Sequence, residues 1–213
     1  MAWIVKNNCI PLYRRILNMT SKQVERVKLK IEKYKKALAA DKKYWGGQYR
    51  DSQGIRYVIP GLFIKIQEYN GAFKYLNWFK KNFPDDSGYP VFLFECAFIL
   101  FKCDKLTEAE RKLYSTFFSN TFLIDKFLDK EPLIFDKYEG SNWENESLVE
   151  NFSYSHNDME FLEFAIWAEN ILKSRKFLDT ANEFIEIQQK LKNEPVGTKR
   201  TELVDRLYKM KYS

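Results

Sequence analysis

Apolar residues recur every three or four positions along most of this chain, and this spacing constrains its fold more than any other feature. Between residues 22 and 45 they form a single seam of Val24, Val27, Ile31, Tyr34, Leu38 and Trp45. Such a seam is typical of an amphipathic helix, because residues three and four apart share one helical face. The chain has 18 Phe, 13 Tyr and 5 Trp against only 8 Gly and 6 Pro, and few helix breakers favour long helices. The sequence therefore predicts an all-α protein.

Further helical patterns follow, each bounded by turn residues. We expect helices over 55–68, 71–82, 89–103, 107–120, 158–174, 176–192 and 199–211. Thr20 or Ser21 is expected to cap the helix that begins at residue 22, and Thr107 with Glu110 has the spacing of a capping box. Asp51 or Ser52 is expected to cap the helix that begins at residue 55.

One stretch, from about 130 to 157, lacks helical periodicity and contains Pro132, Gly140 and many acids. We interpret it as an acidic insertion with a short helix near 144–151. Residues 1–18 also lack a clear period. They are interpreted as an N-terminal extension, and Met19 is an alternative natural start.

The net charge of +6 is unevenly distributed. Residues 22–43 contain nine basic and three acidic side chains, whereas residues 125–163 contain eleven acids and three lysines. The basic and acidic regions are expected either to face each other within one molecule or to mark two docking surfaces. Solvated helix faces are the simpler alternative. Arg56 is expected to pair with an acid of the 125–163 segment.

A repeated pattern of small and large residues occurs in the hairpins. Phe63, Tyr69, Ala72, Leu76 and Pro84 mark a first unit, Leu106, Ala109 and Leu113 follow at a period of 37, and Leu178, Ala181 and Ile185 mark a third unit. The pattern resembles the tetratricopeptide repeat (TPR), in which a small residue lets two antiparallel helices touch. Pro60 stands where the family has glycine, and the second unit lacks the closing proline.

The resemblance implies antiparallel helical hairpins that stack as a short TPR-like α-solenoid, with another helical-hairpin bundle as the alternative. Residues 19–213 would form one helical-repeat domain, with units at about 53–86, 90–121 and 162–195. The first helix of each hairpin would line a concave groove. The partner-binding residues implied by the family offsets are Tyr57, Lys65, Phe94, Glu95, Lys102, Asn170 and Lys173. For each of them the alternative is a place in the core or on a solvated rim.

Motifs of catalysis are missing from the sequence. His156 is the single histidine, so a zinc site is not expected. No serine lies in a nucleophile elbow, and no glycine-rich loop has the spacing of a phosphate-binding motif. We therefore expect neither an enzyme nor a bound cofactor.

The cysteines and the apolar runs bear on the compartment. Cys9, Cys96 and Cys103 cannot all pair, and Cys96 and Cys103 are seven residues apart, about 10 Å along one helix, which is too far for a disulfide. No apolar run is long enough for a membrane span or a secretory signal. A cytoplasmic location is expected.

The function predicted from these features is a protein-interaction scaffold that binds a peptide or a partner helix. The alternative is binding of nucleic acid or another polyanion through the basic helix 22–43, aided by Arg14, Arg15 and the lysine-rich C-terminal tail.

Overall fold

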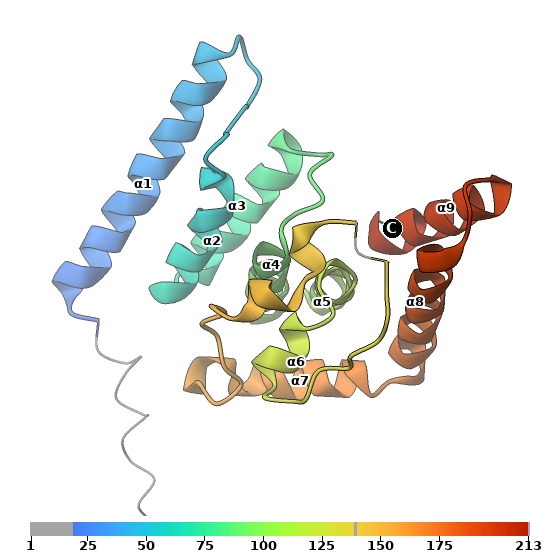
Figure 1. Cartoon of the computed structure of the whole chain (residues 1–213). Coiled ribbons are helices and arrows are strands. Elements are labelled where there is room, and N and C mark those ends of the chain that lie inside the picture. The colour runs from blue at the N-terminus through green and yellow to red at the C-terminus, as the bar shows by residue number, and fades with distance from the viewer. Residues whose placement is uncertain (1–18, 139, 213) are drawn as a thin grey trace, which may run out of the picture.

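The computed structural model describes residues 19–138 and 140–212, and these residues form an all-helical protein without β-strands (Figure 1). Its α-helices are α1 (Ser21–Tyr44), α2 (Ile55–Lys65), α3 (Tyr69–Asn82), α4 (Pro90–Lys102), α5 (Leu106–Ser119), α6 (Leu123–Phe127), α7 (Leu162–Leu172), α8 (Arg175–Asn193) and α9 (Thr198–Tyr212). The extension 1–18, with Cys9, Arg14 and Arg15, lies outside the described residues.

Every long helix predicted from the periodicity is present, and among the described residues α6 is the one α-helix that the periodicity did not indicate. Five residues are too few to show a repeat of 3.6. The 130–157 stretch contains short 3-10 turns at Asn142–Glu144 and Glu146–Val149, and a third turn, Met159–Phe161, leads into α7. The predicted short helix near 144–151 is therefore one turn of 3-10 helix.

The helix starts follow the capping rules in one case and depart from them in another. Thr20 and Gln23 form a reciprocal capping box at the start of α1, as expected. The capping box expected at Thr107 is wrong, because α5 already begins at Leu106 and Thr107 lies inside its first turn.

The hairpins α2–α3 and α4–α5 share one turn geometry, offset by 37 residues. Gln67 and Asp104 both adopt a positive φ, of 56° and 55°. The next amide donates to a carbonyl five residues back in each turn, over 3.1 Å in the first and 2.9 Å in the second. The turn of the third hairpin differs, because Lys173 has a negative φ and Ser174 caps α8 through its hydroxyl. The period is therefore visible in the backbone of two hairpins.

The small residues of the three units lie in the interior of the protein. Ala72, Ala109 and Ala181 are all buried. The central element is α4, which is buried on most sides, and its Phe98 stacks on Phe161 with ring centroids 4.0 Å apart. A second, smaller core joins α5, α8 and α9 around Phe184.

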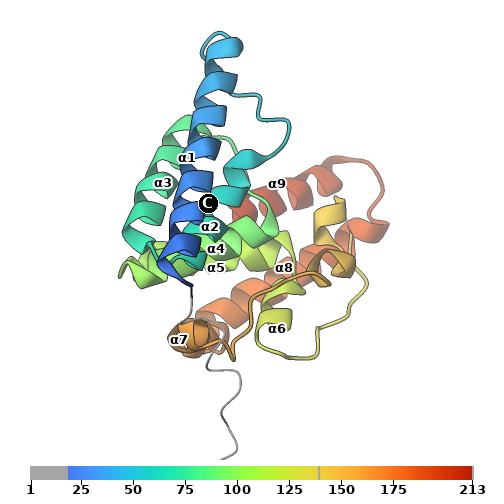
Figure 2. The same cartoon turned by 90° about the vertical axis from the view of Figure 1, so that its left-hand side faces the viewer.

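The hairpins do not share one orientation. In Figure 1, α1, α2 and α3 run lengthwise in the view while α4 and α5 point along the line of sight, and α7 crosses below them. After a quarter turn, α1 and α3 remain upright and α7 is seen end-on (Figure 2). An all-α architecture is confirmed, whereas a TPR-like solenoid of stacked hairpins is not.

The acidic insertion is held to the helices by polar contacts. Asn120 at the end of α5 donates from its side-chain amide to the carbonyls of Trp143 and Asn145, over 2.7 and 3.0 Å. Lys211 of α9 lies 2.6 Å from the carboxylate of Glu144, and Lys192 of α8 pairs with Asp136. Part of the acidic region therefore faces basic residues of the C-terminal helices within the same molecule.

Candidate functional site

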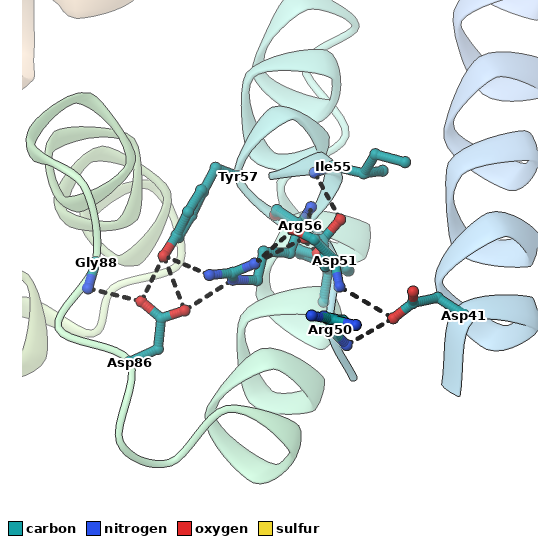
Figure 3. Close-up of polar contacts among 9 residues, drawn as sticks. Asp41, Arg50, Asp51, Ile55, Arg56, Tyr57, Asp86 and Gly88 are labelled. Carbon is teal, nitrogen blue, oxygen red and sulfur yellow. Dashed lines mark hydrogen bonds and ion pairs between the residues drawn. The ribbon is translucent and has the colours of Figure 1, made fainter. Parts of the chain in front are cut away.

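A network of hydrogen bonds and ion pairs surrounds the start of α2 (Figure 3). Asp51 lies just before the helix, and its carboxylate accepts the amides of Ile55 and Arg56 over 2.9 and 3.0 Å. This cap satisfies donors that have no partner within the helix. The loop is held from the other side by Asp41 of α1, which accepts the amides of Arg50 and Asp51. The expected cap by Asp51 is confirmed.

Arg56 lies between two carboxylates. It bonds Asp51 over 2.9 Å and Asp86, in the α3–α4 loop, over 2.7 Å. Tyr57 donates its hydroxyl to Asp86 over 2.6 Å and accepts a bond from Arg56 over 3.0 Å. The expectation that Arg56 pairs with the 125–163 segment is wrong, because the α3–α4 turn brings Asp86 to it first. The network ties α2 to the loop that starts the next hairpin.

A proline in the middle of α2 leads to a further contact between α2 and α3. Pro60 has no N–H, so the carbonyl of Arg56, four residues earlier, has no donor within the helix. The hydroxyl of Tyr75 in α3 donates to this carbonyl over 2.8 Å. Helix α3 therefore completes the hydrogen bonding of α2.

A second buried carboxyl is that of Glu95 in α4, and no cation of the described residues pairs with it. Its Oε1 accepts the hydroxyl of Tyr154, from the acidic insertion, over 2.6 Å. Gly61 of α2 faces the same group, and a Cβ at position 61 would lie 2.6 Å from Oε1 of Glu95. A side chain at position 61 would therefore force the Glu95 carboxyl to shift.

Burial favours the neutral form of Glu95, whereas ion pairing favours the charged form of Arg56. Burial raises the pKa of Glu95 to about 8, although the bonds from Tyr154 and Gly61 act in the other direction. Burial lowers the pKa of Arg56, but its bonds to Asp86 and Asp51 outweigh this and raise it overall. Burial, then the bond to Asp86, raises the pKa of Tyr57 to about 12. At neutral pH Arg56 is charged and Glu95 largely carries a proton.

The seven residues predicted to line a groove lie in different environments. Phe94 is fully buried in the core, so it lines no surface. Tyr57 and Glu95 belong to the two networks described above, and Lys102 is half-buried, with its Nζ 5.5 Å from the ring centroid of Tyr69. Lys65, Asn170 and Lys173 are exposed.

The exposed face of α7 contains two of these residues. Leu162, Ile166, Asn170 and Lys173 are spaced by four, four and three positions, so they share one face. Leu162 is 44% and Ile166 66% exposed. Lys173 lies 3.0 Å from Glu169, which also pairs with Lys130. This face is therefore apolar at its N-terminal end and charged at its C-terminal end.

Two small pockets lie away from α7. The larger has a volume of about 70 Å³ and is lined by serines of several segments together with Trp143, Glu144 and Lys211. The smaller, of about 10 Å³, lies beside Asn120. Pockets that hold organic ligands are usually several hundred Å³ in volume, so these two have room for water or a small ion.

The thiols and carboxylates of the described part form no cluster suited to a metal ion. Cys96 and Cys103 are free, and burial raises the pKa of both thiols, that of Cys96 to about 12. None of the helices described in the structure is both long and apolar enough to span a membrane.

Sequence reasoning missed the contact between Glu95 and Tyr154. The two residues are 59 positions apart, and no repeat or motif connects them. The one available signal was an acid within the strongly apolar run 89–103.

Comparison with known proteins identifies no relative. No protein-family model matches the chain, and no match is found among the curated proteins or the solved structures.

Proposed function

We propose that this protein is a non-catalytic, cytoplasmic scaffold that binds a peptide or a partner helix on the exposed face of α7. The observation that carries the proposal is the pair Leu162 and Ile166, two large apolar side chains on adjacent turns of one exposed helical face. Exposed apolar side chains that adjoin on one face favour contact with a partner, and a partner helix would place its own apolar face against them.

The proposal includes a divergent TPR-like origin of the hairpins. It is supported by the turn shared at Gln67 and Asp104 and by the buried alanines at the family's small-residue positions. In that family the first helix of each hairpin faces the groove, and α7 corresponds to the first helix of the third unit predicted from the sequence. Asn170 and Lys173 would then give polar contacts beside the apolar pair.

A photo-crosslinking residue in place of Ile166 tests this proposal. It is expected to capture a protein in cells of the native source, whereas the same residue in place of Leu29, which is 62% exposed on α1, should not capture it. The captured partner would then be purified for binding measurements.

Replacing both Leu162 and Ile166 by Glu should weaken binding of the purified partner at least about tenfold, since desolvating the new charges opposes docking. Replacement of Leu178, exposed on α8, by Glu is the matched control. Unchanged affinity of the double variant would remove α7 as the binding face.

A second candidate function is polyanion binding through α1. It is supported by Lys22, Arg26, Lys33, Lys36 and Lys43, which are exposed and form no ion pair within residues 19–138 and 140–212. Unpaired cations along one face attract phosphates. Retention on heparin that falls steeply with salt is the expected result, and no retention at about 0.15 M salt would remove this candidate.

A further inference from the structure

The solvent-facing side of α1 combines a row of cations with an exposed aromatic ring at its end. Lys22, Arg26, Lys33 and Lys36 follow one another at intervals of four, seven and three residues, and Tyr44 lies eight residues further along. These intervals are close to multiples of the helical repeat, so the five side chains share one face. The face opposite carries Ile31 and Leu38, which are buried against the rest of the protein.

Tyr44 is 79% exposed although its side chain is large and apolar. The ring of Trp45 meets it edge to face, with centroids 5.0 Å apart, and the guanidinium of Arg50 lies 4.5 Å from the Trp45 ring centroid. Trp45 is therefore held between two neighbours, and Tyr44 is the open ring of the group.

The turn after α1 keeps this arrangement folded. Gly46 and Gly47 both have positive φ, and no atom lies within 4 Å of a Cβ built at either position. Asp41 accepts the amides of Arg50 and Asp51 over 2.8 and 3.0 Å. Its carboxylate is thus engaged by the loop, and the two glycines beside Tyr44 border open space.

We propose that single-stranded nucleic acid binds along this face of α1, with its phosphates at the cations and a base stacked on Tyr44. The inference rests on the polyanion-binding function proposed for α1 and adds the class of polyanion. A cationic track that ends in an aromatic platform is the arrangement by which proteins hold single strands without reading sequence. Bases of a duplex are stacked on each other, so a duplex offers phosphates to the cations but no free base face to the ring.

The test is fluorescence anisotropy of the full chain with a labelled oligouridylate of about ten nucleotides, beside a duplex of the same length and heparin. The wild-type protein is expected to bind the single strand more tightly than the duplex. Tyr44→Ala should weaken single-strand binding about tenfold and leave duplex and heparin binding unchanged. Tyr208→Ala, which removes a 64% exposed ring of α9, is the control.

A variant with fewer charges on α1 separates the contribution of the cations from that of the Tyr44 ring. Lys33→Gln with Lys36→Gln should weaken binding of all three polyanions and reduce the salt slope by about 1.4 for the single strand. Lys126→Gln with Lys209→Gln, exposed lysines elsewhere, makes the same change in net charge and should have little effect.

The outcomes are distinguishable. Equal affinity for duplex and single strand, or an unchanged affinity of Tyr44→Ala, would overturn the stacking site while leaving polyanion binding by α1 in place. Failure of the wild-type protein to bind any of the three probes would overturn both. Far-ultraviolet circular dichroism of each variant checks that the helices are intact.

Discussion

Two buried carboxyl sites flank the same short helix, and they are stabilised in opposite ways. At the start of α2, Asp51 and Asp86 share the guanidinium of Arg56. Near the middle of α2, Glu95 faces Gly61 and has the hydroxyl of Tyr154 as its partner. The first site keeps its charges by pairing them, whereas the second avoids charge by holding a proton. A buried acid thus stabilises or destabilises the fold according to what its neighbour offers.

The largest expected effect concerns Glu95 and pH. The folded state holds a proton on Glu95 up to about pH 8, whereas an exposed Glu releases it near 4.5. The stabilisation that this bound proton gives to the folded state is therefore complete below pH 4.5 and is lost as the pH rises to 8. Glu95→Gln abolishes this titration, so wild type should lose on the order of 4 kcal/mol relative to the variant between pH 5 and 9. Urea unfolding at both pH values measures it, and parallel profiles would contradict it.

Removal of the cation at the other site is the next largest change. Arg56→Met leaves Asp51 and Asp86 without their shared partner, and the free energy of unfolding should fall by about 3 kcal/mol. Arg50→Met, in the loop just before α2, is the matched control, since Arg50 is exposed and forms no ion pair in the part of the chain described. Its effect should stay within about 0.5 kcal/mol. Equal losses in the two variants would show that Arg56 acts by packing alone.

A methyl group at position 61 tests how closely α2 approaches Glu95. Gly61→Ala places a Cβ against Oε1 of Glu95, and we expect a net loss of about 2 kcal/mol. In a Glu95→Ala background the contact with the carboxyl is gone, and the nearest remaining atom is the Tyr154 hydroxyl at 3.3 Å. The same substitution should then stabilise the protein by up to about 1 kcal/mol, because Ala favours helix over Gly. A double-mutant cycle by urea unfolding measures the difference, and additivity would show that the two groups do not interact.

The smallest expected effect comes from one hydroxyl. Tyr57→Phe removes a bond to Asp86 while Arg56 still pairs with it, so the loss should be about 1 kcal/mol. The pH profile of stability between 5 and 9 should keep its shape, because Glu95 is untouched. A shift of that profile would mean that the two carboxyl sites are coupled through α2.

Periodicity predicted the helices well, because their apolar spacing is local. The repeat pattern also placed the small residues Ala72 and Ala109 in the interior, and both are fully buried. Capping was less predictable. Thr107 has the spacing of a box, yet the turn at Asp104 starts α5 two residues earlier than that box requires.

The polar sites show where local reasoning stops. The cap by Asp51 could be predicted because donor and acceptor are four and five residues apart. The partner of Arg56 could not, because Asp86 is brought by a turn whose path depends on the packing of α3 and α4. The contact of Glu95 with Tyr154 depends on the path of the acidic insertion, which follows no helical period.

Pro60 has a consequence for how the protein opens. Because Tyr75 supplies the donor that Pro60 lacks, the start of α2 is fully hydrogen-bonded only while α3 is docked on it. Fraying of α2 from its N-terminus and undocking of α3 thus become one event. In native-state hydrogen exchange the amides of both helices are expected to share a single opening free energy, as one cooperative unit. Proline in a helix usually marks a weak point, and here it makes a hairpin unfold as a whole.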